Sequence, residues 1–272
     1  MYEVSFSKTI QLIHKEIQGK LNNTNSIIND YIASDIPIIP KLGQYFFKKR
    51  GKQLRPVMCL LSSKMINKNY PKLKTDTYMS AALEFIHAAT LLHDDVIDKG
   101  TIRRGQKSIN EIWNNKFSIL LGDFMFSKSF QLMTQGKSLK ALEHLSEVSS
   151  KISEGEFLQL SNENNITLKS SEYIKIISLK TAELFGAAMK VPAILTGKKN
   201  QEIVNLYKLG INFGIIPNFF LASKQELKTP LRPLFKTNSA LETTLPATLP
   251  ATLLATLLAV LTTEPALETT LP

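Results

Sequence analysis

Apolar residues recur at intervals of three and four positions through most of the first 216 residues, whereas strict alternation of apolar and polar residues is rare. That period is typical of helices with one apolar face. A representative stripe runs through Leu83, Ile86, His87, Thr90, Leu91 and Asp94. Glycine, proline, asparagine and charged residues gather between the periodic segments, at 34–40, 67–72, 99–106, 135–137, 162–167 and 197–200. The pattern predicts an all-α helical bundle.

The end of the chain differs from this pattern. From residue 237 onward there is no Lys, Arg, Phe or Tyr, and the sequence Leu-Glu-Thr-Thr-Leu-Pro at 241–246 returns at 267–272. We therefore predict a helical domain over residues 1–216 and a divergent, low-complexity, poorly ordered tail over 217–272. An alternative for 251–261 is a short helix that contacts a membrane, although this stretch is too short to span one.

Composition and charge bound the class of protein. A chain of 272 residues with 43% hydrophobic content can bury a full core. The formal net charge of +10 favours anionic partners such as phosphates, nucleic acid or a membrane surface. The single cysteine, Cys59, excludes an intramolecular disulfide framework and suits a reducing compartment. We see no secretory signal and no membrane span before residue 240, so we expect a protein that is not secreted.

An acidic cluster follows the strongly apolar run 81–92. Asp94 and Asp98 are four residues apart, so on a helix their carboxylates share a face, and Asp95 adds a third charge beside them. Carboxylate oxygens at the end of a buried helix suit Mg²⁺, which bridges to substrate phosphates. A solvated acidic face is the alternative for such a motif taken alone.

Basic residues flank this cluster in the sequence. Lys52 and Arg55 precede it, and Arg103 and Arg104 follow it directly. Guanidinium groups bind diphosphate well because their planar donors match its oxygens. A basic solvated loop is the alternative for each motif by itself.

Several motifs in order together resemble the trans-isoprenyl (polyprenyl) diphosphate synthases, and the similarity extends to long-chain, solanesyl-type prenyltransferases. The matching residues are Gly51-Lys52-Gln53-Leu54-Arg55-Pro56, Glu84 to His87, His93 to Asp98 with Arg103-Arg104, Gly122-Asp123, Glu154-Gly155-Glu156 with Gln159, and Lys180-Thr181. The resemblance implies the isoprenoid synthase type of helical bundle, Mg²⁺ as cofactor, and isopentenyl diphosphate and an allylic prenyl diphosphate as substrates.

The resemblance also implies roles for single residues. The predicted ligands of isopentenyl diphosphate are Lys52, Arg55, His87 and Arg104; the predicted Mg²⁺ ligands are Asp94 and Asp98, supported by Asp95; and the predicted contacts to the allylic diphosphate are Arg103, Lys180 and Thr181. Catalysis is expected to rest on Asp94, Asp95, Asp98 and Lys180. By itself, His87 could equally be a core histidine. Small residues upstream of the aspartates, Ala88, Ala89 and Thr90, imply a product of twenty carbons or more.

The family pattern breaks near residue 216. The register predicts a second aspartate-rich motif at 217–221, where the chain reads Pro-Asn-Phe-Phe-Leu, and Gly214 stands where the family usually has Gln. A frameshift, a truncation with a replaced end or a gene-model error is the hypothesis for this change. The break impairs the expected activity, and the alternative function is a catalytically inactive helical subunit or partner that binds diphosphate or an active synthase.

Partners and location are expectations of the same kind. The resemblance implies a homodimer, and we expect no nucleic-acid binding because the basic residues belong to diphosphate motifs. The Lys-, Asn- and Ile-rich composition suits a bacterial cytoplasm or a plastid stroma with an organelle-encoded gene.

Overall fold

The computed structural model describes the backbone of residues 6–67, 69–163, 165 and 167–224. In chain order the elements are α1 (Phe6–Ile32), α2 (Ile38–Lys48), α3 (Leu54–Ile66), η1 (Tyr70–Lys72), α4 (Thr75–Ile97), β1 (Ile102–Arg103), β2 (Gln106–Lys107), α5 (Ile109–Ile112), α6 (Asn115–Gln135), α7 (Leu139–Ser161), α8 (Ser170–Ile177), η2 (Ser178–Ala182), α9 (Glu183–Leu195) and α10 (Asn200–Lys224). Helices dominate the described residues, and the all-α prediction is confirmed. Of the predicted tail, residues 217–224 lie in α10 and 225–272 lie outside the described residues.

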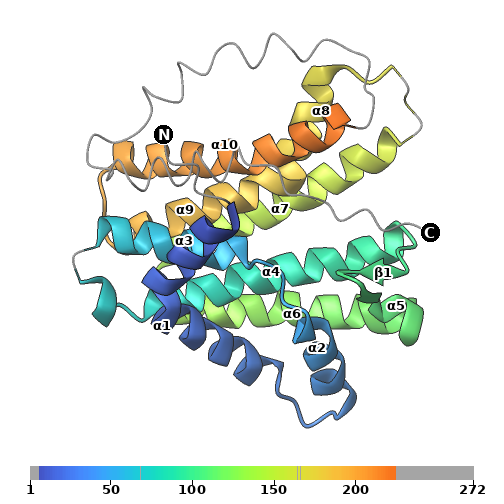
Figure 1. Cartoon of the computed structure of the whole chain (residues 1–272), viewed down its shortest axis with the longest axis horizontal. Coiled ribbons are helices and arrows are strands. Elements are labelled where there is room, and N and C mark those ends of the chain that lie inside the picture. The colour runs from blue at the N-terminus through green and yellow to red at the C-terminus, as the bar shows by residue number, and fades with distance from the viewer. Residues whose placement is uncertain (1–5, 68, 164, 166, 225–272) are drawn as a thin grey trace.

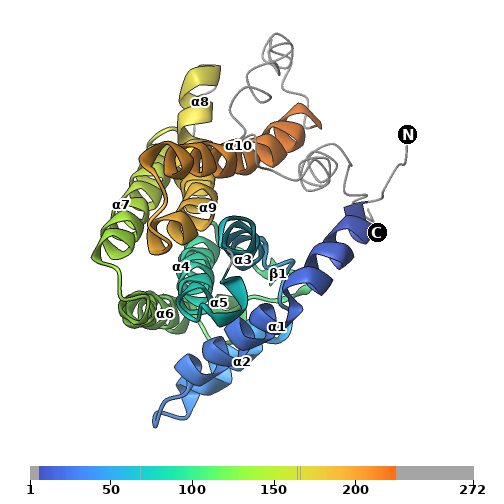
Figure 2. The same cartoon turned by 90° about the vertical axis from the view of Figure 1, so that its left-hand side faces the viewer.

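Helix α4 lies at the centre of the bundle, with α1, α3, α6 and α9 packed around it (Figure 1; Figure 2). It is apolar on nearly all sides, which is stable only when other helices cover it. Its fully buried side chains include Met79, Leu83, Phe85, Ile86 and Leu92. The burial of this helix fixes the position of its C-terminal end, where the acidic cluster begins.

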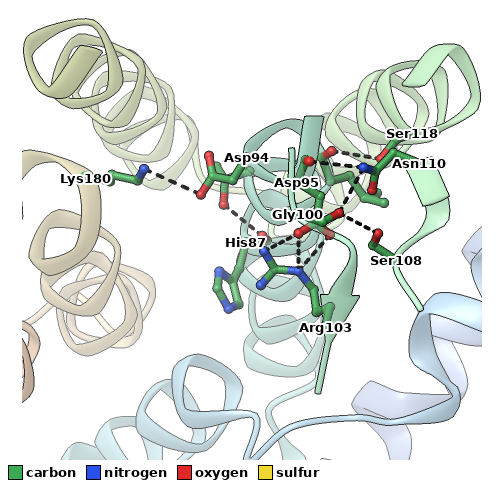
Figure 3. Close-up of polar contacts among 11 residues, drawn as sticks. His87, Asp94, Asp95, Gly100, Arg103, Ser108, Asn110, Ser118 and Lys180 are labelled. Carbon is green, nitrogen blue, oxygen red and sulfur yellow. Dashed lines mark hydrogen bonds and ion pairs between the residues drawn. The ribbon is translucent and has the colours of Figure 1, made fainter. Parts of the chain in front are cut away.

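Side chains from the next helices donate to backbone carbonyls near that end, where the last carbonyls of a helix lack partners within it. Ser118 Oγ of α6 donates to the carbonyl of Leu92 at 2.8 Å. The Asn110 amide of α5 donates to the carbonyls of Asp95 at 3.2 Å and Gly100 at 3.0 Å. These contacts hold the end of α4 and the following loop together (Figure 3).

The predicted break at 99–106 contains a short hairpin, β1–β2, with Ile102 opposite Lys107. Its turn residues Arg104 and Gly105 have φ angles of 51° and 67°. Two consecutive left-handed residues favour a turn that matches the twist of paired strands. The hydroxyl of Tyr45 on α2 donates to the Lys107 carbonyl at 2.7 Å, which fastens the hairpin to the bundle.

Helices α7, α8, α9 and α10 form the other side of the bundle (Figure 2). Between α8 and α9 the backbone makes one turn of π-helix, 178–182, which the periodicity did not predict. The chain also breaks at 49–53, where no break was predicted, and α2 begins at Ile38, inside the predicted break 34–40. Pro40 fits there because the first turn of a helix tolerates proline. No helix of the described residues has the length and apolarity needed to cross a membrane.

Candidate active site

A cavity of about 400 Å³ opens between the C-terminal half of α4, helix α7 and the π-turn 178–182. Its polar lining includes Arg55, His87, Asp94, Glu156, Lys180 and Thr181. Five of these six residues are predicted site residues, drawn from four separate motifs. The structure therefore brings much of the predicted site together around one cavity.

Asp94 faces α7 and the π-turn. Its carboxylate lies 3.7 Å from the Lys180 ammonium, which is also 2.7 Å from the carboxylate of Glu156. Burial raises the pKa of Asp94 to about 6, Lys180 opposes that shift, and the nearby charges of Glu156 and Asp98 reinforce it. The negative end of the helix dipole adds to this crowding of negative charge. The site is therefore suited to an additional cation.

Asp95 faces the other way, toward the hairpin (Figure 3). Its buried carboxylate accepts hydrogen bonds from Arg103 Nε at 2.9 and 2.8 Å and from a terminal guanidinium nitrogen at 2.6 Å. Neither Asp95 nor Arg103 lines the 400 Å³ cavity. Both line a separate, small pocket beside Tyr45 and Ser108. Here Asp95 and Arg103 bind each other, and their proposed roles toward metal and allylic diphosphate stay predictions.

Arg104 lies in the same small pocket and donates to the Lys49 carbonyl at 3.1 Å. A Cβ atom at Gly51 would lie 2.8 Å from the Arg104 guanidinium carbon, so a larger residue here would require the Arg104 side chain to shift. This contact explains structurally why a glycine opens the Gly51 to Pro56 motif. The motif's Lys52 is exposed and does not line the cavity.

Arg55, which is charged, and His87 lie side by side in the sequence-predicted part of the cavity wall. Arg55 Nε is buried and has no hydrogen-bond partner in the described part of the chain, and its guanidinium lies 4.5 Å from the centre of the Phe185 ring. Burial lowers the pKa of Arg55 to about 10, which leaves it charged at neutral pH. Burial and the neighbouring Arg55 and Arg104 hold the pKa of His87 well below its usual range. His87 is therefore a neutral hydrogen-bonding group here.

Asp98 caps the C-terminal end of α4, where its backbone N–H donates to the Asp94 carbonyl at 2.8 Å. Its side chain is exposed and does not line the cavity. The shared face of Asp94 and Asp98 therefore reaches from the cavity to the surface. The assignment of Asp98 to a metal ion stays a prediction.

Close packing explains the Glu154-Gly155-Glu156 motif. A Cβ atom at Gly155 would lie 2.7 Å from the backbone nitrogen of Lys180, so only glycine lets α7 come this near the π-turn. That approach places Glu156 against Lys180, which the sequence did not predict. Ser118 and Asn110 were also missed, because single polar residues that bind distant carbonyls leave no periodic signal.

The chain is similar to known proteins over most of its length. Residues 36–217 match the family model described as polyprenyl synthetase. The chain is 39% identical over 211 residues to octaprenyl diphosphate synthase of Escherichia coli, covering 78% of this chain and 63% of that protein. It is 33% identical over 210 residues to a prenyl transferase of Cyanidium caldarium, covering 77% and 64%.

Solved structures of polyprenyl diphosphate synthases also resemble this chain. A decaprenyl diphosphate synthase from Rhodobacter capsulatus superposes with a TM-score of 0.73 at 34% identity, covering 76% of this chain and 63% of that one. A polyprenyl synthase from Caulobacter crescentus, complexed with calcium and isoprenyl diphosphate, gives 0.73 at 37% identity, covering 76% and 62%. The chain thus spans less than two thirds of the length of these relatives.

Proposed function

The chain belongs to the polyprenyl synthetase family, and from that premise we propose that it condenses isopentenyl diphosphate with an allylic diphosphate to elongate an all-trans polyprenyl diphosphate. The observation that carries the proposal is the cavity in which cationic, carboxylate and apolar side chains meet. A diphosphate leaving group, the metal ion that balances it and a hydrocarbon chain need this combination in one place.

Magnesium fits the carboxylates of the cavity. Asp94 and Glu156 both line it, and Glu156 Oε1 is buried without a hydrogen-bond partner. In the described part of the chain no three His, Cys, Asp or Glu side chains form a metal cluster. Mg²⁺ commonly takes one or two carboxylates and completes its shell with water and substrate phosphates. We propose that Asp94 in the cavity and Asp98, one turn further along the same face of α4, hold the ion. When bound, the ion would neutralise the departing diphosphate.

The cations of the wall would bind and orient the substrates. Lys180 and Thr181 are proposed to contact the allylic diphosphate, and Arg55 and the neutral His87 to contact that of isopentenyl diphosphate, together with Lys52 and Arg104. The allylic carbon–oxygen bond would break, the isopentenyl double bond would attack that carbon, and a proton would leave. The buried Nε of Arg55, which has no hydrogen-bond partner among the described residues, supports an anionic ligand at this position.

Apolar residues complete the cavity, namely Leu91, Ile97, Ile152, Phe157 and Leu160. Such a wall would exclude water from the allylic cation and receive the hydrocarbon chain. The small buried residues Ala88 and Ala89 lie further back in α4. They support the proposal of a product of twenty carbons or more.

A second candidate function is a non-catalytic partner that binds diphosphate. The sequence favours it at 217–221, where the family register calls for aspartates and none is present. One experiment separates the two candidates. The purified chain is incubated with radiolabelled isopentenyl diphosphate, farnesyl diphosphate and Mg²⁺, and its products are separated by chain length.

We expect elongated prenyl diphosphate from the unmodified chain and from Asp30→Asn, an exposed control on α1. We expect none from Asp94→Asn. If the unmodified chain makes no product yet binds diphosphate with Mg²⁺ in calorimetry, the partner role replaces catalysis. Absence of both product and binding would overturn both functions.

We also propose that a second copy of the chain is its partner. Helix α6 exposes the apolar side chains Ile119, Leu120 and Phe130 by 42%, 62% and 39%. An apolar stripe of this kind is suited to an interface. Light scattering should give a dimer for the unmodified chain and a monomer for Leu120→Glu. The proposed location, cytoplasm or plastid stroma, rests on composition alone.

A further inference from the structure

The π-turn 178–182 carries two of the predicted site residues, Lys180 and Thr181. π-Helical turns are rare because their hydrogen bonds and packing are less favourable than those of the α-helix, and they concentrate at functional sites. A side chain in such a turn keeps its direction only if other contacts fix the register of the turn. Glu183, the first residue of α9, makes contacts of this kind.

Two ion pairs of opposite polarity join α7 to this region. Lys151 of α7 lies 3.1 Å from the carboxylate of Glu183, and Glu156 of α7 lies 2.7 Å from the ammonium of Lys180. Gly155 lies between them and permits the backbones to touch. If α7 slid along the segment 178–183, Lys151 would approach Lys180, or Glu156 would approach Glu183. Like charges repel each other at short range, so both shifts are unfavourable. The crossed pairs therefore specify a single register.

The second oxygen of Glu183 is also bound. The hydroxyl of Tyr207 on α10 donates to Glu183 Oε2 at 2.6 Å. Gly186 leaves space for this tyrosine, because a Cβ atom there would lie 2.7 Å from its ring. Glu183 is only 8% exposed and does not line the cavity. A buried carboxylate with partners on two other helices is well suited to holding a segment in place.

We propose that Glu183 is a positioning residue for Lys180. Through Lys151 and Tyr207 it holds the π-turn in register, so that the Lys180 ammonium points into the cavity beside Asp94. Without this anchor the turn is free to adopt α-helical hydrogen bonding, in which a shift of one residue rotates a side chain by about 100°. The inference rests on the proposed function, because it assigns Lys180 to diphosphate.

The test compares Glu183→Gln with Glu183→Asp, which keeps the charge and the crossed arrangement, and with Glu143→Gln, an exposed control on α7. Calorimetry measures the Kd of inorganic diphosphate in the presence of Mg²⁺. Hydrogen–deuterium exchange of 178–182 and the urea midpoint are measured on the same samples. Glu183→Gln keeps the shape of the side chain but removes the charge that Lys151 faces.

We expect Glu183→Gln to raise the Kd about tenfold and to speed exchange at 178–182, as when a supporting contact of a ligand group is removed. Glu183→Asp, which keeps the charge on a side chain shorter by one methylene, should recover most of the affinity, which a loss caused by packing alone would not do. Glu143→Gln should match the unmodified chain.

Three results would decide against parts of this account. If Glu183→Gln keeps the unmodified Kd, Glu183 does not position Lys180. If Glu183→Asp binds no better than Glu183→Gln, the charge of Glu183 does not set the register. If the unmodified chain fails to bind diphosphate, the proposed function fails, and unchanged exchange at 178–182 in Glu183→Gln would then separately overturn the anchor.

Discussion

Acidification is expected to destabilise the fold through one buried imidazole, that of His144 on α7. Lys190 Nζ lies 3.3 Å from His144 Nδ1, and because an ammonium can only donate, Nδ1 must accept. The proton then sits on Nε2, which is buried without a hydrogen-bond partner. The ring also packs edge-on against Tyr207 with centres 5.7 Å apart. A second proton would have to enter beside the ammonium groups of Lys190 and Lys151.

Burial, reinforced by those two lysines, lowers the pKa of His144 from 6.5 to about 4. In this pH range the unfolded chain binds more protons than the folded one, so stability falls as the pH falls. The stability is fully present above pH 6.5 and is lost progressively down to about pH 4. At about 1.4 kcal/mol per pH unit, the loss is about 2 kcal/mol between pH 7 and pH 5 and about 3 kcal/mol by pH 4.

Urea unfolding followed by circular dichroism at pH 7, 6 and 5 measures this loss through linear extrapolation. Other groups titrate in the same range, so the decisive quantity is the difference between the unmodified chain and His144→Asn, which keeps an acceptor for Lys190. We expect that variant to lose about 2 kcal/mol less between pH 7 and pH 5. His93→Asn, which leaves His144 in place, should retain the loss. If the free energy of unfolding falls equally with pH in the unmodified chain and in His144→Asn, protonation of His144 does not cause the loss.

Three further predictions concern stability and reactivity. Gly155→Ala should lower the free energy of unfolding in urea by about 1–3 kcal/mol, because its Cβ meets the π-turn backbone. Gly19→Ala, which has nothing within 4 Å of its Cβ, should raise that free energy by up to about 1 kcal/mol. Equal effects of the two substitutions would contradict this prediction. Asp95→Asn should cost about 3 kcal/mol, measured likewise, because it weakens the buried pair with Arg103; an unchanged midpoint would contradict it. Burial raises the pKa of Cys59 to about 12, so a thiol reagent at pH 8 should label it only in urea, and rapid labelling of the folded chain would contradict its burial.

Much of the fold followed from the period of apolar residues, because helices must bury their apolar faces whatever their partners. The run before Asp94 predicted a buried helix, and α4 is packed against α1, α3, α6 and α9. Breaks were harder to predict. Residues 49–53 contain no proline and only one glycine, yet the chain turns there because Gln53 adopts a left-handed conformation, with φ of 47°. A tertiary contact decides such a break, since the Gln53 amide donates to Asn25 of α1 at 2.8 Å.

Part of the candidate site could likewise be predicted from helical geometry, whereas the rest depends on tertiary contacts. Adjacent residues on a helix point about 100° apart, so helical geometry alone separates Asp95 from the face shared by Asp94 and Asp98. The sequence could not supply the cation that each carboxylate meets. Lys180 reaches Asp94 only because a π-turn and Gly155 bring two helices together, and Arg103 reaches Asp95 only because a hairpin folds back. Local periodicity carries neither signal, so a motif can identify the chemistry of a site while its partners remain a property of the packed chain.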